Sequence, residues 1–297
     1  MDRQEAKPFV KWAGGKRQLL PIINENLPAE LKRNKINKYI EPFVGGGAVL
    51  FDIVQKYCFE QILINDYNKD LINLYSHIRN NVMDLISELL KISDTYLDLR
   101  EEDRSIYFYN AREQYNKVTQ GTIEKSALFI FLNRTCFNGL YRVNSKGDFN
   151  VPYGKYKSPT ILDADNLCKV SEVLSNITIL NGDFSIIGDY VDNRTFVYFD
   201  PPYRPLSTTS NFTSYAKPDF NDEEQKRLAE FFTKLNSKNA KLMLSNSDPK
   251  NTDIGDNFFD ELYNHPGFNI RRVDAKRNIN SKGNGRGKIT ELLITNY

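Results

Sequence analysis

The run at residues 197–203 constrains the fold most, because an apolar, aromatic segment stops there on a carboxylate followed by two prolines. The apolar part is typical of a buried strand. Neither proline can donate to a sheet ladder, so the strand ends at Asp200, and Pro201 biases that residue toward an extended backbone. Ligands of open α/β sheets bind outside the carboxyl ends of the strands. We therefore expect a ligand-binding turn at this strand end.

The four residues at 200–203, called the DPPY turn below, combine an acid, rigid carbonyls and an aromatic face. Such a set can hold a planar, amine-bearing ring, because Asp200 and the Pro201 carbonyl accept the two amine protons while Tyr203 stacks on the ring. Pro202 completes the rigid turn. An exocyclic ring amine is the predicted ligand.

A second pattern lies at residues 39–66. A short strand at 39–44 leads into three glycines, 45–47, and then a helix at 48–53, which is the order of a nucleotide-type βαβ unit. Glycines there let a ligand approach the backbone closely. The next strand, 61–64, ends at Asp66, at about the twenty-residue spacing where an acid hydrogen-bonds ribose hydroxyls. No Walker lysine follows the glycines, so we expect an adenosine-containing ligand that is not held by a triphosphate loop.

The segment at residues 11–16, KWAGGK, is a third candidate element. Its two glycines make a tight turn that brings Trp12 and Lys16 toward one ligand. Lys16 could pair with a carboxylate, and Trp12 could cover an apolar or cationic group.

Strand and helix patterns alternate over most of the chain, which predicts an α/β fold. Residues 97–174 depart from this rhythm: helical patterns at 104–118 and 123–136 precede an alternating run that predicts a β-hairpin around Lys146-Gly147. We expect residues 1–80 and 176–297 to form the two halves of one domain, with residues 81–175 as an insertion. Further strands are expected at 177–180, 241–244, 270–273 and 292–295, and helices at 69–92, broken near Asn80-Asn81, and at 222–235.

Charge is unevenly distributed although the chain carries a formal net charge of only +2. Residues 104–157 contain nine Lys/Arg against three Asp/Glu, together with eleven Phe/Tyr, and residues 265–288 contain seven Lys/Arg against one Asp. Basic regions of this kind predict contacts with a polyanion.

Cysteine and histidine usage excludes several kinds of site. The three cysteines are odd in number and widely spaced, and the two histidines have no partner at ligand spacing. We therefore expect no disulfide framework, no metal centre and no histidine-based triad. The polar N-terminus and the lack of a membrane-length apolar run predict a cytoplasmic location.

Taken together, six motifs resemble the Dam-type (alpha-group) adenine-N6 DNA methyltransferases, including the restriction-system enzymes that protect GATC sites. The motifs occur in the family's order over nearly the whole chain: KWAGGK at 11–16, FVGGG at 43–47, ND at 65–66, NGLYR at 138–142, FNVPYG at 149–154 and DPPY at 200–203. The resemblance implies a Rossmann-like, S-adenosylmethionine-dependent methyltransferase sheet with an inserted, mainly helical DNA-recognition domain that contains the hairpin.

The resemblance also implies residue roles. Trp12 and Lys16 would approach the methionine end of S-adenosylmethionine, Asp66 would hold its ribose, and Asp200 would lie beside both cofactor and target base. Further implied cofactor contacts are Phe43, Gly45, Gly47, Asp183 and Phe184, and implied DNA contacts are Arg134, Phe137, Asn138, Arg142, Asn144 and Tyr156. Two positions depart from the common pattern: Gly46 where many members carry another residue, and Phe137 where some carry tyrosine.

The implied activity is methylation of a flipped-out adenine in double-stranded DNA within GATC, in a bacterial or phage-encoded setting. We expect a monomer and, where a companion restriction nuclease exists, no stable complex with it. Two alternatives stay open. An RNA guanine-N2 or glutamine-N5 methyltransferase is disfavoured by the basic insertion, and a non-catalytic DNA-binding module is disfavoured by the intact Lys16, Asp66 and DPPY turn.

Overall fold

The computed structural model describes residues 5–204, 220–276 and 288–297. Within these ranges the chain divides into two compact units. The first unit comprises Met1–Gly15, Gly45–Lys56 and Asn68–Gly182, and the second comprises Lys16–Val44, Tyr57–Tyr67 and Asp183–Tyr297. The division expected from the sequence, with residues 1–80 and 176–297 as the halves of one domain and residues 81–175 as an insertion, stays a prediction. Part of the basic region at 265–288 lies outside the described residues.

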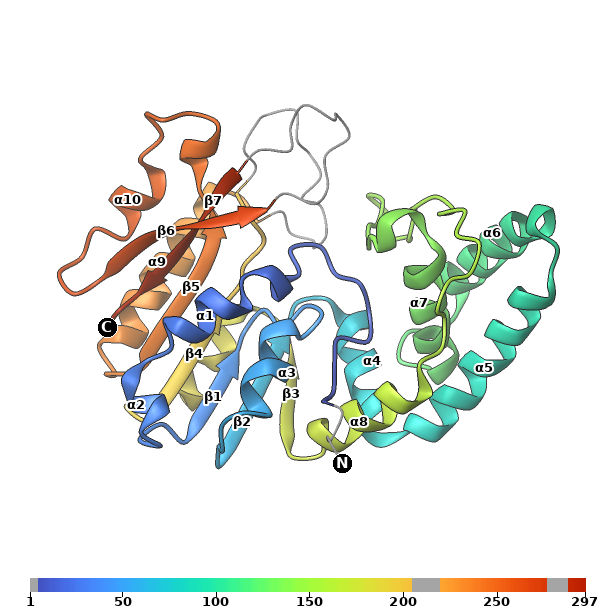
Figure 1. The fold of residues 1–297 in the computed structure, drawn as a ribbon, viewed down its shortest axis with the longest axis horizontal. Coiled ribbons are helices and arrows are strands. Elements are labelled where there is room, and N and C mark those ends of the chain that lie inside the picture. Colours follow the sequence, from blue (N-terminus) through green and yellow to red (C-terminus); the bar gives the residue numbers. More distant parts are fainter. Residues whose placement is uncertain (1–4, 205–219, 277–287) are drawn as a thin grey trace. The chain divides into compact units, whose positions relative to one another are not determined.

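The second unit is organised around a mixed sheet (Figure 1). The strand order within this unit is β2-β1-β4-β5-β7-β6, and β3 belongs to the first unit. Strands β1, β2, β4 and β5 are parallel, whereas β7 runs antiparallel to both β5 and β6. The bounds are β1 Lys38–Glu41, β2 Gln61–Asp66, β3 Ile177–Asn181, β4 Thr195–Phe199, β5 Lys241–Ser247, β6 Asn269–Lys276 and β7 Lys288–Thr295.

The neighbouring strands β1 and β4 form the switch point of this sheet. The chain continues from β1 to β2 on one side and from β4 to β5 on the other. All five residues of β4 are buried, as expected for a parallel strand covered on both faces, and the strand ends directly before Asp200 as the prolines predicted. The carboxyl ends of β1 and β4 therefore meet where α/β sheets bind ligands.

Short helices and one long helix complete the second unit. Helix α9 packs on β5 through an apolar face that includes Leu228, Phe232 and Leu235. The bounds are η1 Lys16–Gln18, α1 Leu20–Glu25, α2 Ala29–Lys32, η3 Phe184–Tyr190, α9 Asp222–Asn236, η4 Pro249–Asn251 and α10 Phe258–Leu262.

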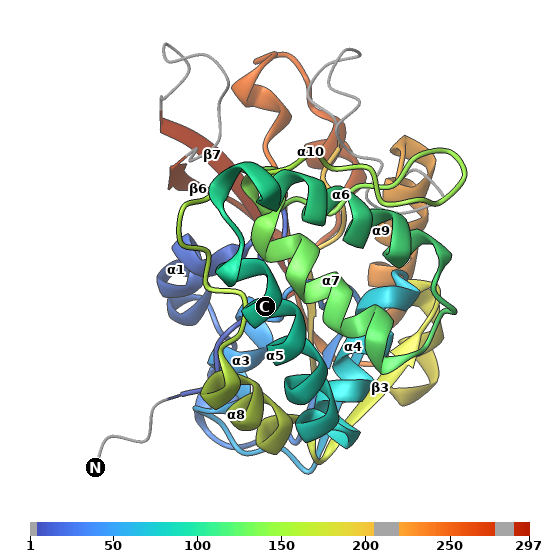
Figure 2. The ribbon, with the colours of Figure 1, turned by 90° about the vertical axis from the view of Figure 1, so that its right-hand side faces the viewer.

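The first unit is mainly helical, and Figure 2 shows α7 with its neighbours α5 and α6. Helix α7 is buried over most of its length. Side-chain caps start three helices: Asn68, Thr122 and Asp163 accept from backbone N–H groups of α4, α7 and α8. The bounds are α3 Ala48–Val54, α4 Lys69–Asn80, α5 Val82–Asp98, α6 Glu101–Lys117, α7 Ile123–Thr135, η2 Phe137–Gly139 and α8 Ala164–Leu174, so the break expected near Asn80-Asn81 is confirmed.

The predicted hairpin is present as two isolated antiparallel bridges, Cys136 with Tyr153 and Val143 with Phe149. Asn144 holds the turn, because its Oδ1 accepts from the backbone N–H groups of Lys146 and Asp148. No helix among the described residues is long and apolar enough to span a membrane.

A buried carboxyl group ends strand β1. The Glu41 side chain is 2% exposed and accepts a hydrogen bond from the Tyr39 hydroxyl. Burial raises the pKa of Glu41 to about 8, against the hydrogen bond from Tyr39, and the charge of Asp200 raises it further. Glu41 is therefore protonated at neutral pH.

Replacing Glu41 with glutamine should flatten the pH dependence of stability. Between pH 4.5 and about 8 the folded chain keeps a proton that the unfolded chain releases, so the free energy of unfolding of the wild type falls as pH rises. One proton corresponds to about 1.4 kcal/mol per pH unit. Urea unfolding across this window should show a smaller slope for Glu41→Gln, while the exposed Glu261→Gln variant keeps the wild-type slope. Parallel curves for all three proteins would contradict the assignment.

Candidate active site

The centre of the site is a buried ion pair at the start of the DPPY turn. The Lys16 Nζ atom lies 2.9 Å from Asp200 Oδ1, and the two side chains are 4% and 23% exposed. Ser245 donates to the same Oδ1 atom at 3.3 Å. Burial raises the pKa of the Asp200 carboxyl, and the charge and hydrogen bond of Lys16 oppose this shift. Among the described residues, Asp200 Oδ2 has no partner, so it can accept a hydrogen bond from a ligand.

The tyrosine of the DPPY turn is held by two charged side chains. Lys16 Nζ donates to the Tyr203 hydroxyl and lies 4.3 Å from the ring centroid. The hydroxyl in turn donates to Glu291 Oε2 at 2.5 Å. Burial, followed by the charges of Asp200 and Glu291, raises the pKa of Tyr203 well above its usual value, so the phenol is a neutral donor. Glu291, in β7, is a site residue that the motif analysis missed.

The backbone of the DPPY turn is anchored by buried amides. Gln225 Nε2 donates to the Pro202 carbonyl at 3.0 Å, and Asn246 Nδ2 donates to Gln225 Oε1 at 3.1 Å. Both amide side chains are fully buried. Gln225 thus occupies the Pro202 carbonyl, and acceptance of a ligand hydrogen bond by the Pro201 carbonyl stays a prediction.

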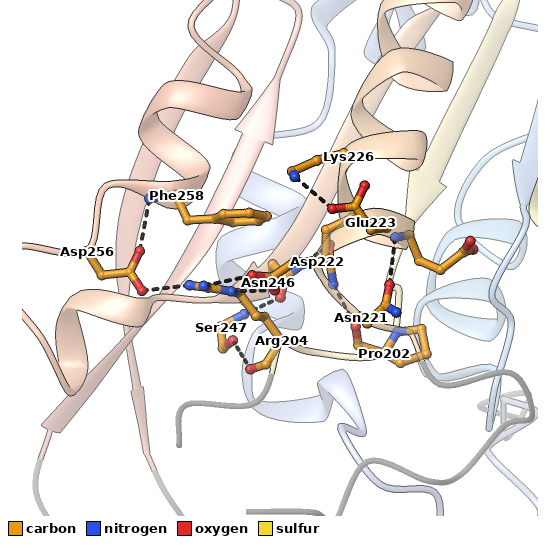
Figure 3. A network of polar contacts seen from close by, with 12 residues as sticks. Pro202, Arg204, Asn221, Asp222, Glu223, Lys226, Asn246, Ser247, Asp256 and Phe258 are labelled. Atoms are coloured by element: carbon orange, nitrogen blue, oxygen red, sulfur yellow. Dashed lines mark hydrogen bonds and ion pairs between the residues drawn. The ribbon is translucent and has the colours of Figure 1, made fainter. Parts of the chain in front are cut away.

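Arg204, the residue that follows the DPPY turn, is held in place by several side chains (Figure 3). Its guanidinium lies 2.7 Å from Asp222 and 2.6 Å from Asp256, and it covers the ring of Phe258 at 4.2 Å. The Arg204 carbonyl accepts from Ser247 Oγ at 3.3 Å. Side chains from α9, β5 and the segment before α10 therefore hold one end of the turn.

Asp183 is engaged by the protein itself. It caps η3 through the Ser185 N–H and forms a two-pronged pair with Arg227, at 2.9 and 2.6 Å. The bonds from Arg227 lower the pKa of Asp183 to about 2. Phe184 is buried beside Phe43, with ring centroids 5.5 Å apart. These contacts place Asp183, Phe184 and Phe43 in one cluster of the second unit.

Asp66 is the last residue of β2, at the carboxyl end of that strand, and it is partly exposed. The preceding Asn65 is buried, donates to the Pro42 carbonyl at 3.0 Å, and accepts from the Val44 N–H through its own carbonyl. These bonds join the carboxyl ends of β1 and β2. Asp66 therefore sits beside the chain that leads into the glycines.

In the first unit, the glycine turn packs against aromatic side chains. Gly45 and Gly47 both have positive φ, 48° and 73°. A Cβ atom on Gly45 would lie 2.7 Å from the Trp12 ring, and one on Gly47 would lie 2.6 Å from the Tyr75 hydroxyl. Trp12 also stacks on Tyr141, with centroids 5.6 Å apart. Packing within the protein is thus sufficient to require glycine at both positions.

The predicted DNA contacts lie in the first unit and divide into two groups. Phe137 is 51% exposed, and the neighbouring Asn138 is exposed with a φ of 55°. Arg142 donates from Nε to Asn150 Oδ1 at 2.7 Å and from Nη2 to the Asn150 carbonyl at 3.3 Å. Its Nη1 has no partner among the described residues, so Arg142 keeps donors for a ligand.

The second group has structural contacts. Arg134 donates to the Phe9 carbonyl at 2.7 Å, and Asn144 caps the hairpin turn as described above. The Tyr156 ring lies 4.7 Å from Lys11 Nζ. These contacts give the three residues a role in packing whether or not they also touch DNA.

Comparison with known proteins shows relatives along the whole chain. Residues 12–279 match the family described as D12 class N6 adenine-specific DNA methyltransferase. Type II methyltransferase M.MjaIII of Methanocaldococcus jannaschii is 56% identical over 99% of this chain and 100% of its own length. Type II methyltransferase M1.LlaDCHI of Lactococcus lactis is 42% identical over 98% and 95%, and the DNA adenine methylase of Haemophilus influenzae is 36% identical over 97% and 92%.

The family match covers the KWAGGK segment from Trp12 on, the glycine turn, the hairpin and the DPPY turn, which are elements on which the resemblance was based. It confirms that resemblance and disfavours the RNA methyltransferase alternative. The chain belongs to the D12 class of N6 adenine-specific DNA methyltransferases.

Proposed function

We propose that this protein transfers a methyl group from S-adenosylmethionine to the N6 amine of an adenine flipped out of duplex DNA, within GATC. The observation that carries the proposal is Asp200, whose Oδ2 is available at the carboxyl end of β4 while Oδ1 is held by Lys16 and Ser245. The GATC sequence rests on the motif resemblance alone.

The DPPY turn suits the chemistry of an exocyclic adenine amine. That amine is a weak nucleophile, because its lone pair is delocalised into the ring. Hydrogen bonds to Asp200 Oδ2 and the Pro201 carbonyl hold the two amine protons, so the lone pair points away from both acceptors. The neutral ring of Tyr203 offers the flipped base a stacking partner. Orientation and electrostatics then lower the barrier without a covalent intermediate on the protein.

Two carboxylates of the second unit fit a cofactor that has ribose hydroxyls and a positively charged sulfur. Asp66 and Asp200 lie at the carboxyl ends of β2 and β4, and both are acceptors for such groups. When bound, S-adenosylmethionine supplies an electrophilic methyl group. Lys16 is engaged with Asp200 and Tyr203, so we propose that it first orders these two residues; its contact with the cofactor carboxylate stays a prediction. The cofactor contacts of Trp12, Phe43, Gly45, Gly47, Asp183 and Phe184 also stay predictions.

The hairpin of the first unit is the proposed DNA reader. Phe137 and Asn138 are exposed before it, and Arg142 within it keeps Nη1 for a base edge. Two relatives are named type II methyltransferases, which supports a role in protecting DNA from a companion nuclease. The lack of a stable complex with that nuclease, the monomeric state and the cytoplasmic location stay predictions from the sequence.

Replacing Asp200 with alanine should abolish most of the methyl transfer. Loss of a preorganised acceptor costs roughly a hundredfold to a thousandfold in rate. Single-turnover transfer of labelled methyl to GATC duplexes measures the effect, with cofactor affinity measured alongside. Asp189→Ala, an exposed acid of the same unit, should match the wild type. An Asp200→Ala protein within a few-fold of the wild-type rate would show that Asp200 is structural.

Replacing Asp66 with alanine should weaken cofactor binding, because ribose hydroxyls lose a charged acceptor. A charge-assisted hydrogen bond of about 1.5–3 kcal/mol corresponds to about a tenfold to hundredfold loss of affinity. Calorimetric titration with S-adenosylmethionine gives the number. Glu60→Ala, just before the amino end of the same strand, is the matched control. Unchanged affinity for Asp66→Ala would rule out the ribose contact.

Replacing Arg142 with alanine should relax sequence discrimination. Arginine pairs with guanine O6 and N7 in the major groove, and loss of one such contact costs about 1–3 kcal/mol on the correct site. Methylation of GATC and single-base variants should be compared at two salt concentrations. Lys146→Ala, exposed at the hairpin tip, is the contrasting variant, since loss of a phosphate contact weakens binding to all duplexes alike. The same uniform loss for Arg142→Ala would identify Arg142 as a phosphate contact.

A further inference from the structure

We propose that Glu291 is a positioning residue for methyl transfer, acting through the hydroxyl of Tyr203. The inference rests on the proposed function, because it assigns a supporting residue to the same DPPY turn. No motif that identified the family contains Glu291.

Glu291 sits at a rigid place in the sheet. Strand β7 lies between β5 and β6, and Glu291 is paired with Ser247 on one side and Val273 on the other. Its backbone is therefore held by neighbours on both sides, whereas the DPPY turn has no ladder of its own because of the two prolines. A carboxylate on β7 can serve as a fixed reference point for a side chain in that turn.

The contacts form a chain of donors that ends on Glu291. Lys16 Nζ donates to the Tyr203 hydroxyl, and the hydroxyl donates to Glu291 Oε2 at 2.5 Å. Lys16 Nζ lies 3.8 Å from the same carboxylate oxygen, and the Glu291 side chain is 18% exposed. A neutral phenol that donates to a carboxylate forms a short, charge-assisted bond. Glu291 therefore fixes the far end of the Tyr203 side chain.

Fixing that end matters because a tyrosine side chain has few freedoms. The DPPY turn sets the Cα position, and the bonds of the hydroxyl to Lys16 and Glu291 determine where the far end of the ring lies. Together these contacts fix the axis of the ring on which the adenine is proposed to stack. A tyrosine side chain that swings between rotamers would hold the base less often in the orientation that Asp200 requires.

The sequence contained a signal for Glu291 that the motif analysis did not use. Residues 289–295 read ITELLIT, so a single charged residue interrupts an otherwise apolar strand pattern. Charged residues inside a sheet are seldom buried unless they are paired. Such an interruption indicates a partner, although only the fold shows that the partner is Tyr203.

A double-mutant cycle tests the inference. Glu291→Gln keeps the shape and removes the charge, and Tyr203→Phe keeps the ring and removes the hydroxyl. Tyr203→Phe should slow single-turnover methyl transfer about tenfold, the worth of one hydrogen bond to a charged group, and Glu291→Gln should slow it by up to that factor, because it leaves a weaker, neutral acceptor. Because both changes act on the same bond, the double variant should be no slower than the slower single variant. Glu261→Gln, exposed on α10, makes the same change in charge away from the DPPY turn and should keep the wild-type rate.

Several results would overturn the proposal. Losses that multiply in the double variant would mean that Glu291 does not act through Tyr203. A wild-type rate for either single variant would show that the bond is unimportant, and Tyr203→Phe gives this answer even if Glu291→Gln fails to fold. A thermal melt of each variant separates instability from slow transfer. If the wild type itself transfers no methyl group to DNA, the proposed function fails, and that outcome is distinct from all of these.

Discussion

The site depends on one buried ion pair, between Lys16 and Asp200, at the point where β4 stops. Removing an ammonium and a carboxylate from water is costly, and the cost is recovered only when each ion keeps good partners. Here Lys16 has Asp200, Tyr203 and Glu291 around its Nζ atom, and Asp200 has Ser245 as a second donor. On Asp200, both Lys16 and Ser245 contact the same oxygen, Oδ1. The other oxygen of Asp200 has no partner among the described residues, and it is the acceptor that we propose for the adenine amine.

The two prolines explain why so many side chains surround the same turn. A strand end without proline would continue its ladder or turn back with backbone bonds, but the DPPY turn lacks two N–H donors. Its position is fixed instead from outside, by the amide pair Gln225 and Asn246 and by the ion pairs of Arg204. The prolines make the turn stiff, and these side chains determine where the stiff turn points.

The sequence predicted those features that local chemistry determines. The end of β4 directly before Asp200 and the break before α5 follow from proline and asparagine preferences, and the structure confirms them. The hairpin predicted around Lys146-Gly147 is present as isolated bridges rather than as regular strands. Glu291 and Gln225 were missed because their role comes from strands and helices that are distant in sequence. Lys16 was expected to face a cofactor carboxylate, whereas its observed partners include Asp200, which is distant in sequence. Only the strand order brings such residues together.

The distribution of polar groups in the sheet follows from the same constraint. The middles of β1, β4 and β5 are apolar, while Glu41, Asp200 and the run from Ser245 to Ser247 lie at their carboxyl ends. Groups that must be both dry and hydrogen-bonded cost stability, so a chain gains by confining them to one edge. At these carboxyl ends, each strand holds its own last residue in place. Pairing between neighbouring strands then sets the distance between their last residues. A switch point between parallel strands thus provides the rigidity that an acceptor such as Asp200 needs, with the apolar sheet beneath it supplying the stability.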